Sequence, residues 1–425
     1  MTDIGAILRT DPVLAQVARV TGTAEVWVAG GWIRDRAIGR TPTEIDLAVP
    51  GSATETEELA VRLSELVQAH PHLLGRAPHA VWRLEGRHLK VEIWPRGSLT
   101  VTKDCLRRDF TLNAIQWRLP DGPLEDPTGG VRDLDQRILR AVSRANLVDD
   151  PVRLLRAPRF LAQIPGFRLD PLTQRWLAEL AHLAARAPRE RLGQELLRTV
   201  LAPRPATGLH HLHTLGLLTA IAPEGLAAGR IPLPLAAATL AWLQANGRRL
   251  LRWGLDPDAV EAARLGALLA AWNPGSPCVE AFAWPSPLRR HAMAAATAVP
   301  TTLRTAGRSA PIRREHMVRA GDRFPASLCL GCAAAASTGR QIEPWRRWWR
   351  QWRRTGRRLV ERPPLLRGDE VASILGRPPG PWLGEALDAL RGAQLRGEVR
   401  TPVGARRWLR RFQAGRGIAI MSGSD

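Results

Sequence analysis

The sequence predicts an α+β protein, with a small mixed-sheet head followed by segments that are all helical. Over the first 140 or so residues, short β-like runs alternate with a few helical patterns, and polar turns separate them. After residue 150 the apolar residues recur at helical spacing, broken by Pro and Gly. A length of 425 residues with 45% hydrophobic residues is enough for several packed domains.

The net charge predicts a large anionic partner. The chain carries 61 Lys and Arg against 40 Asp and Glu, a formal charge of +21. Nucleic acid is the natural candidate, because such a charge attracts a phosphate backbone over a wide surface. The absence of Tyr and the high Pro and Gly content also fit a GC-rich codon bias, so the charge is supporting evidence only.

The N-terminal residues show no secretion signal, and no apolar run is long enough to span a bilayer. Four cysteines do not make a disulfide framework for a chain of this length, and the expected location is the cytoplasm. Cys329 and Cys332 form a lone CLGC without a second ligand pair, which predicts buried helix thiols in place of a zinc site.

The first motif of the head is a strand, a glycine turn and a helix. Residues 26–29 are expected to be extended, Gly30 and Gly31 to form the turn, and residues 32–38 to be helical. Two glycines let a phosphate approach the backbone, and the helix that follows directs free N–H groups toward the anion. Arg34 adds a forked donor nearby. The remaining β-like runs are EIDLAV (44–49), AVWRLEG (80–86), LKVEIW (89–94) and TLNAIQWRL (111–119).

Three acidic residues in these runs indicate a metal site. Side chains alternate along a strand, so Glu44 and Asp46 project from one face while Ile45 and Leu47 point inward. Glu92 lies in a second apolar strand, where a lone carboxylate would be costly without a cation. Carboxylates on neighbouring strands beside a phosphate-sized turn are what two-metal nucleotidyl transfer requires, with Mg²⁺ as the ion. Taken singly, the turn and the acidic pair are common surface features.

The order of five motifs resembles the class II tRNA nucleotidyltransferases, a family that includes bacterial poly(A) polymerases. The motifs are GGWIRD (30–35), EIDLAV (44–49), DCLRRDFTLNAI (104–115), DPTGGVRDL (126–134) and DDPVRLLRAPRF (149–160). The resemblance continues through ERLGQELL (190–197), LGLLTAIAPE (215–224) and the segment 362–399. It implies a catalytic nucleotidyltransferase head at 1–140, a base-reading neck at 141–205, a body at 206–310 and a tRNA-binding tail at 311–425.

This resemblance implies template-independent addition of C, as CC or full CCA, from CTP and ATP to the 3′ end of tRNA. The 3′-hydroxyl would attack the α-phosphate and release pyrophosphate, with Mg²⁺ held by Glu44 and Asp46. The implied site consists of the catalytic residues Glu44, Asp46 and Glu92 and the nucleotide-binding residues Gly30, Gly31, Arg34, Arg107, Arg108, Asp109, Asn113, Asp150, Arg153 and Arg156. Arg107, Arg108 and Asp109 are similar to residues that handle the phosphates and sugar, while Asn113 holds the backbone of that motif and Asp104 secures the preceding loop.

Asp150 and Arg153 are three residues apart at an expected helix start, so their side chains share a face. A carboxylate can accept from the exocyclic amino group of cytosine or adenine, and a guanidinium can donate to the adjacent ring acceptors. Asp150 and Pro151 also form a good helix start, with Asp150 as the cap and Pro151 in the first turn, which needs no ligand; both roles can be true together.

Two departures from the family pattern leave the activity open. Glu44 stands where the family has Asp, and the extra methylene moves the carboxylate by about one C–C bond, a shift of roughly 1 Å to which reaction geometry is sensitive. Only residues 93–103 separate Glu92 from Asp104, a shortening that resembles the CC-adding branch, whose members leave the terminal A to a separate A-adding enzyme. A full CCA-adding enzyme, a poly(A) polymerase and a catalytically weakened RNA-binding relative remain alternatives.

A tryptophan stripe in the C-terminal part has two interpretations. Trp345, Trp348, Trp349 and Trp352 recur at helical spacing, and the remaining faces carry Arg346, Arg347, Arg350, Arg353 and Arg354. Exposed indoles would stack on RNA bases, whereas a buried stripe would leave only the arginines to meet phosphates. The regular apolar spacing favours the buried stripe. His210, His211 and His213 are assigned to a helix of the body, without a metal.

Overall fold

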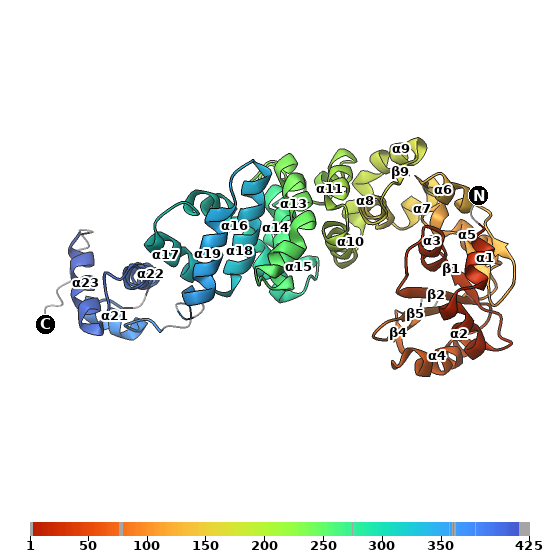
Figure 1. Cartoon of the computed structure of the whole chain (residues 1–425), viewed down its shortest axis with the longest axis horizontal. Helices are drawn as coiled ribbons and strands as arrows, with labels where there is room; N and C mark the ends of the chain where they lie inside the picture. Colours follow the sequence, from red (N-terminus) through yellow and green to blue (C-terminus); the bar gives the residue numbers. More distant parts are fainter. Residues whose placement is uncertain are drawn as a thin grey trace. The chain divides into compact units, whose positions relative to one another are not determined.

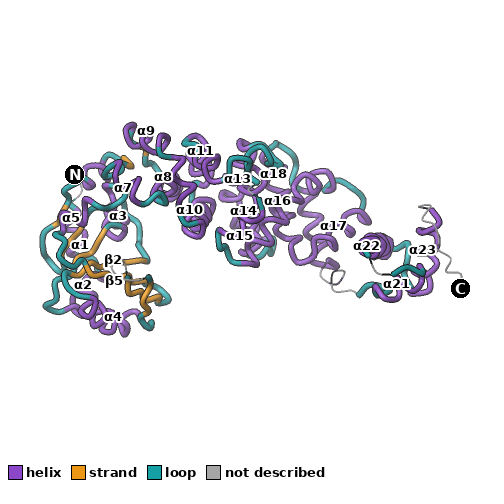
Figure 2. The backbone as a smooth tube through the Cα atoms, turned by 180° about the vertical axis from the view of Figure 1, so that it is seen from behind, coloured by secondary structure: helices purple, strands orange, loops and turns teal. Residues whose placement is uncertain are grey.

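The computed structural model describes residues 3–75, 80–273, 275–356, 358, 360, 363–378 and 380–415. The chain forms two compact units, Met1–Pro223 and Glu224–Asp425 (Figure 1). Of the described strands, all lie in the first unit, where Figure 2 shows them in orange. An α+β head followed by a helical remainder is therefore confirmed as the fold class.

The head contains a seven-stranded mixed sheet in the order β3-β4-β5-β2-β1-β6-β7. Strands β2 and β5 are parallel, while the other neighbours in the sheet are antiparallel. The strands are β1 (Trp27–Ala29), β2 (Glu44–Val49), β3 (His72–Leu74), β4 (Val81–Glu85), β5 (Lys90–Pro95), β6 (Gln116–Arg118) and β7 (Leu124–Glu125). A second sheet pairs β8 (Ile138–Leu139) with β9 (Arg168–Leu169).

One predicted strand is shorter than its apolar run suggests. Within residues 111–119, Thr111–Asn113 form a 3₁₀ turn, and β6 begins at Gln116. The hydroxyl of Thr111 donates to Asp133 (2.7 Å) and the amide of Asn113 donates to Asp109 (3.1 Å). These side-chain bonds favour a turn over a continued strand.

The helices of the first unit pack on the sheet and then extend from it as a helical array. Helix α4 contacts β4 and β5, and α3 contacts β1 and β2. Ser52 and Glu55 form a reciprocal capping box at the start of α4. The helices are α1 (Ile4–Arg9), α2 (Pro12–Thr21), α3 (Gly31–Ala37), α4 (Ala53–Val67), α5 (Val101–Leu106), α6 (Gly130–Asp135), α7 (Arg144–Asp149), α8 (Arg153–Gln163), α9 (Pro171–Glu179), α10 (Arg189–Leu201), α11 (Pro205–Thr214) and α12 (Leu217–Ile221), with 3₁₀ turns η1 (Thr111–Asn113) and η2 (Ala181–Arg186).

The second unit is helical throughout the part that the structure describes. Helices α14, α16 and α18 pack on one another, and a separate small apolar core joins α21, α22 and α23. The helices are α13 (Leu233–Arg252), α14 (Pro257–Ala271), α15 (Ser276–Ala281), α16 (Ser286–Thr305), α17 (Ala310–Ala320), α18 (Phe324–Ser337), α19 (Glu343–Gln351), α21 (Gly368–Leu375), α22 (Pro381–Arg396) and α23 (Pro402–Gly415), with the short turns η3 (Gly321–Arg323) and η4 (Trp352–Gly356). Among the described helices, none combines the length and apolar character needed to cross a bilayer.

The tryptophan stripe faces the interior of the second unit. Trp345, Trp348 and Trp349 are buried, and the indole of Trp349 donates to the backbone carbonyl of Trp253 (2.7 Å). Trp352 is half-buried and its ring lies 4.7 Å from that of Phe324. The arginines of the stripe, Arg346, Arg347, Arg350, Arg353 and Arg354, are exposed. The buried interpretation is confirmed, as is the prediction that Cys329 and Cys332 are buried thiols of a helix, α18.

Candidate active site

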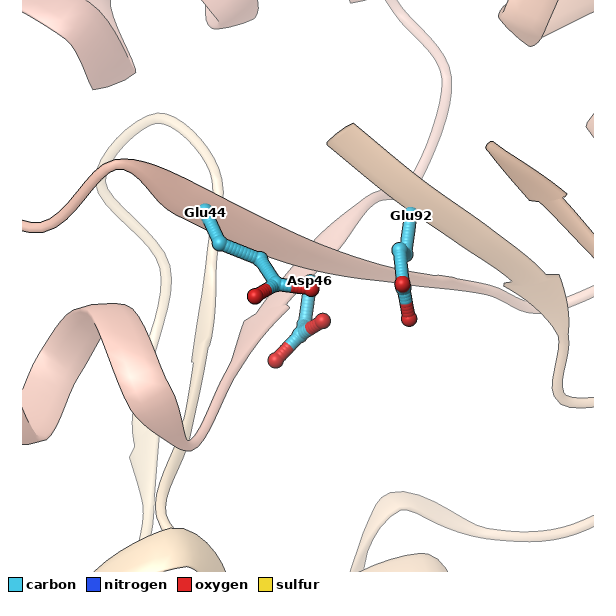
Figure 3. A group of neighbouring side chains, drawn as sticks. All are labelled: Glu44, Asp46 and Glu92. Carbon is cyan, nitrogen blue, oxygen red and sulfur yellow. The ribbon is translucent and has the colours of Figure 1, made fainter. Parts of the chain in front are cut away.

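Glu44, Asp46 and Glu92, here called the carboxylate cluster, project from the same face of two neighbouring strands. The register of β2 and β5 places Asp46 directly opposite Glu92. One carboxylate oxygen from each residue lies within 4.8 Å of the others, and Figure 3 shows the three side chains converging. Ile45 and Leu47 are fully buried, so the alternation predicted for this strand holds. The expected juxtaposition of the three acids is present.

The chemistry of the cluster fits a divalent cation. Burial, followed by the charges of Glu44 and Glu92, raises the pKa of Asp46 to about 7. A carboxyl group with such a pKa lies where its anion is disfavoured despite the charges of Arg108 and Arg156, and a bound cation would stabilise that anion. Several carboxylate oxygens at short separation are the ligands preferred by hard cations such as Mg²⁺ and Ca²⁺. The residues present therefore fit a divalent metal.

Two basic side chains that the sequence reasoning did not single out lie against the cluster. The ammonium of Lys90 is 2.7 Å from Glu44 Oε1 and 3.0 Å from Glu92 Oε1. Arg83, on β4, reaches Glu92 Oε1 at 2.6 Å. Their approach depends on the order of β4, β5 and β2 in the sheet, which the local pattern of the sequence does not specify.

The two glycines of the first turn have different surroundings. Gly30 has φ +50°, and a Cβ there would lie 2.6 Å from the carbonyl oxygen of Asn113, so glycine is required for packing. At Gly31 a Cβ would have its nearest neighbour, an oxygen of Asp46, at 3.7 Å. A side chain at Gly31 would therefore stand in ordinary van der Waals contact with Asp46 and Arg34, so no steric clash requires glycine there.

Arg34 is buried and its guanidinium is engaged within the protein. It donates to both carboxylate oxygens of Asp35 (3.0 and 2.9 Å) and to the side-chain oxygen of Asn113 (2.8 Å). Asn113 in turn donates to Asp109. The turn after β1 is therefore tied to the Arg-Arg-Asp segment through side chains.

Asp109 is the buried centre of the Arg-Arg-Asp segment. It accepts from the backbone N–H of Phe110 (2.8 Å) and lies 2.9 Å from Arg156 Nε. Burial by itself raises the pKa of Asp109, but the Arg156 guanidinium and the hydrogen bonds from Asn113 and the backbone outweigh it, so the pKa is lowered. We name the chain Arg34–Asn113–Asp109–Arg156 the ion-pair network.

The two arginines before Asp109 differ in their contacts. Arg107 is exposed and lines the pocket described below. Arg108 is paired with Asp104 (3.0 Å), and its guanidinium carbon lies 5.1 Å from the centre of the Trp94 ring. Asp104 also accepts from Gln116 of β6, so it links the loop before the Arg-Arg-Asp segment to the sheet.

Asp150 and Arg153 lie together, but the helix begins later than the sequence suggested. Helix α7 ends at Asp149 with Asp150 as its C-cap, and α8 begins at Arg153 after an intervening turn that contains Pro151. The carboxylate of Asp150 is 3.7 Å from Arg153 Nε. Arg191 of α10 donates to both of its oxygens (3.1 and 2.8 Å), a bidentate contact between elements far apart in the sequence.

One large polar pocket, with a volume of about 1000 Å³, unites these groups. Of the thirteen predicted site residues, all except Asp150 line it; Asp150 touches it through its partners Arg153 and Arg191. Lining residues that sequence reasoning missed include Arg83, Lys90, Trp94, Arg96, Arg159, Arg191, Gln194, Glu195 and Arg198. The last four residues lie on α10 at i, i+3, i+4, i+7 spacing. This polar stripe could have been found from the helical period of the sequence.

Three convergent carboxylates beside an arginine-lined pocket fit an enzyme that uses a divalent metal and acts on phosphates. Comparisons with known proteins identify the class of enzyme. Residues 26–140 match the poly(A) polymerase head domain, and residues 166–228 match the probable RNA- and SrmB-binding site of polymerase A.

Two curated relatives match over nearly the whole chain. The CC-adding tRNA nucleotidyltransferase of Thermus thermophilus is 32% identical, covering 92% of this chain and 94% of the relative. The CC-adding tRNA nucleotidyltransferase of Geobacter sulfurreducens is 29% identical, covering 94% of each. Among solved structures, the Bacillus stearothermophilus CCA-adding enzyme in complex with CTP is 25% identical with a TM-score of 0.66, covering 98% of this chain and 99% of that one. The chain belongs to the tRNA nucleotidyltransferase family that shares the poly(A) polymerase head domain.

Proposed function

We propose that this enzyme adds cytidine to the 3′ end of tRNA from CTP and stops after the second cytidine. The observation that supports CC addition is the short connection between the carboxylate cluster and the Arg-Arg-Asp segment. Strand β5 ends at Pro95 and α5 begins at Val101. The shortening matches the resemblance to the CC-adding branch, and two full-length relatives are named CC-adding enzymes.

In this proposal Glu44, Asp46 and Glu92 hold Mg²⁺. When bound, the ion supplies activation of the attacking 3′-hydroxyl and neutralisation of the triphosphate charge. The role of the protein is to keep the three carboxylates within 4.8 Å of one another on a rigid pair of strands. Glutamate at position 44 retains the charge of the aspartate found in the family, so we assign it as a ligand.

The triphosphate is held by the basic wall of the pocket. Gly31 lines the pocket beside Asp46, and the exposed Arg107 and the half-buried Arg108 face the same pocket. Guanidinium groups bind phosphate oxygens in a bidentate manner that fixes orientation. Arg34, Asp109, Asn113 and Arg156 position this wall through the ion-pair network.

The base is selected by Asp150 and Arg153. A carboxylate and a guanidinium side by side match the amino donor and the ring acceptors of cytosine. Arg191 holds both oxygens of Asp150 and thereby fixes the direction of its remaining lone pairs. Adenine offers a similar edge, so the pair by itself does not exclude ATP.

We further propose a division of labour along the chain, with a catalytic head at 1–140, a base-reading neck at 141–205, a body at 206–310 and a tRNA-binding tail at 311–425. The formal charge of +21 and the exposed arginines beside the buried tryptophan stripe support RNA binding by the helical part. Such contacts to phosphates supply affinity that falls steeply with salt.

A test uses purified protein, Mg²⁺ and tRNA transcripts that end before the CC, after one C or after both. Each transcript receives CTP or ATP alone. Extension by CTP that halts after two cytidines, with no A added to the CC-ended transcript, is the expected result. Extension of no transcript would overturn the proposal and favour a weakened RNA-binding relative.

Full CCA addition is the second candidate, favoured by the likeness to the CCA-adding enzyme of B. stearothermophilus. Incorporation of A on the CC-ended transcript would establish it. Repeated ATP addition to RNAs unrelated to tRNA would instead indicate a poly(A) polymerase. The match to the head domain, taken alone, is equally compatible with that activity.

A further inference from the structure

Lys90 lies between two members of the carboxylate cluster. The parallel register pairs Glu44 with Lys90 and Asp46 with Glu92, so two acids of β2 face a base and an acid of β5. The ammonium of Lys90 approaches Glu44 at 2.7 Å and Glu92 at 3.0 Å. Among the ion pairs of the described residues, it is the cation that contacts two members of the cluster.

Arg83 provides a useful contrast. It contacts Glu92 at 2.6 Å and Glu85 at 3.6 Å, so it joins the cluster to an acid outside it. Lys90 instead bridges the two residues that flank Asp46, and its side chain is 23% exposed. A compact ammonium with three donors suits such a bridge better than a planar guanidinium.

The bridge bears directly on metal binding. Glu44 and Glu92, whose Oε1 atoms contact Lys90, are two of the three residues that could hold a divalent ion. Positive charge at this point offsets the mutual repulsion of the acids, which would otherwise push Glu44 and Glu92 apart. The same charge opposes the approach of a second cation, because a metal ion and an ammonium at contact distance repel each other.

We propose that Lys90 is a positioning residue that acts as the resident counter-cation of the carboxylate cluster. It holds Glu44 and Glu92 at bridging distance in the metal-free protein and competes with the divalent ion for their oxygens. This inference rests on the proposed function, in which the cluster is the metal site. It also gives Glu44 a partner: the longer side chain at position 44 carries its carboxylate to a lysine directly across the strand pair.

The test compares Lys90→Met with the wild-type chain in two measurements that do not depend on nucleotide addition. Mn²⁺ affinity is measured from the electron paramagnetic resonance signal of the free ion, and the melting temperature is measured in EDTA. Lys90→Met is expected to bind Mn²⁺ about tenfold more tightly, the effect of removing roughly 1.4 kcal/mol of charge repulsion. Its melting temperature in EDTA is also expected to be a few degrees below that of the wild type. Addition of Mn²⁺ is expected to raise the melting temperature of Lys90→Met more than that of the wild type.

Two variants serve as controls for charge. Lys103→Met removes the same charge from an exposed lysine of α5 outside the cluster and is expected to change neither quantity. Lys90→Arg keeps a cation on β5 and is expected to remain within threefold of the wild-type affinity. If Lys90→Met does not fold in EDTA, the Mn²⁺ affinity is measured on Lys90→Gln.

Asp46→Ala separates failure of this inference from failure of the proposed function. If Asp46→Ala loses Mn²⁺ binding while Lys90→Met binds Mn²⁺ as tightly as or more weakly than the wild type, the counter-cation role is overturned and the metal site stands. Ordinary Mn²⁺ binding by Asp46→Ala overturns both, because the cluster then is not the metal site.

Discussion

The carboxylate cluster and the ion-pair network lie in the same pocket, yet their charges are balanced in opposite ways. In the network the buried Asp109 has a guanidinium at 2.9 Å and two hydrogen-bond donors, and its pKa is lowered. In the cluster Asp46 is surrounded by two further acids, and its pKa is raised to about 7. The network is balanced by partners within the protein, whereas in the cluster Lys90 and Arg83 contact Glu44 and Glu92, and we propose that a divalent ion supplies further positive charge.

The largest expected effect comes from removing the central acid of the cluster. Asp46→Ala should lower the rate of CTP incorporation by at least about 10³-fold, equivalent to roughly 4 kcal/mol of transition-state stabilisation. Binding of tRNA should be nearly unchanged, because RNA affinity resides in basic groups elsewhere. Single-turnover incorporation and filter binding measure the two quantities. Glu57→Ala, an exposed acid of α4, is the matched control; ordinary activity of Asp46→Ala would refute the assignment.

Breaking the ion-pair network should reduce stability. Asp109→Ala leaves Arg156 without its buried partner, and the free energy of unfolding should fall by about 2–4 kcal/mol. Urea denaturation measures this change, with the exposed Asp121→Ala as a control that should stay within about 0.5 kcal/mol of the wild type. If Asp109→Ala has the same urea midpoint as the wild type, the ion-pair network does not stabilise the fold.

Neutralising Asp46 should have the opposite effect on stability. In the metal-free protein the pKa of Asp46 is raised from 3.8 to about 7. The contribution of Asp46 to the free energy of unfolding is therefore fully present below pH 3.8 and is lost as the pH rises through about 7. Asp46→Asn should therefore melt at a higher temperature than the wild type at pH 8 in EDTA.

The difference in melting temperature should shrink toward pH 4, where the wild-type carboxyl is protonated in the folded state. Mg²⁺ at pH 8 should raise the melting temperature of the wild type but not that of Asp46→Asn. Thermal scans across this pH range supply the measurement. If Asp46→Asn is less stable than the wild type at pH 8 in EDTA, the negative charge of Asp46 is already neutralised by basic groups of the protein.

The smallest expected effect comes from removing one exposed arginine of the helical part, which should change tRNA affinity without changing the rate of CTP incorporation. Arg347 is exposed beside the buried tryptophans of α19. Arg347→Ala should weaken tRNA binding modestly and reduce the slope of log affinity against log salt by about 1, with CTP incorporation at saturating tRNA unaffected. Binding isotherms at several salt concentrations measure the slope. An unchanged slope would remove Arg347 from the RNA-binding surface.

Local pattern predicted that two of the acidic residues share one strand face, whereas most other site residues were indicated by the resemblance to a known family. The alternation in residues 44–49 placed Glu44 and Asp46 on one face, because side chains of a strand point alternately to its two sides. The spacing of Trp345, Trp348 and Trp349 indicated a buried helix face, because that spacing matches the helical period. The start of α8 was expected too early, because the turn at Pro151 also fits a helix start in sequence.

The sequence by itself determined most of the extended and helical segments, their apolar faces and the order of the motifs, although Thr111–Asn113 form a 3₁₀ turn within a predicted strand. Only the tertiary structure decided that β5 pairs with β2, which brings Glu92 and Lys90 to Glu44 and Asp46, and that α10 brings Arg191 to Asp150. The reason is physical. Periodicity arises from the geometry of a single segment, whereas strand order and helix docking depend on apolar contacts between residues far apart in the chain. Charges brought together by such packing have no signature at short range in the sequence.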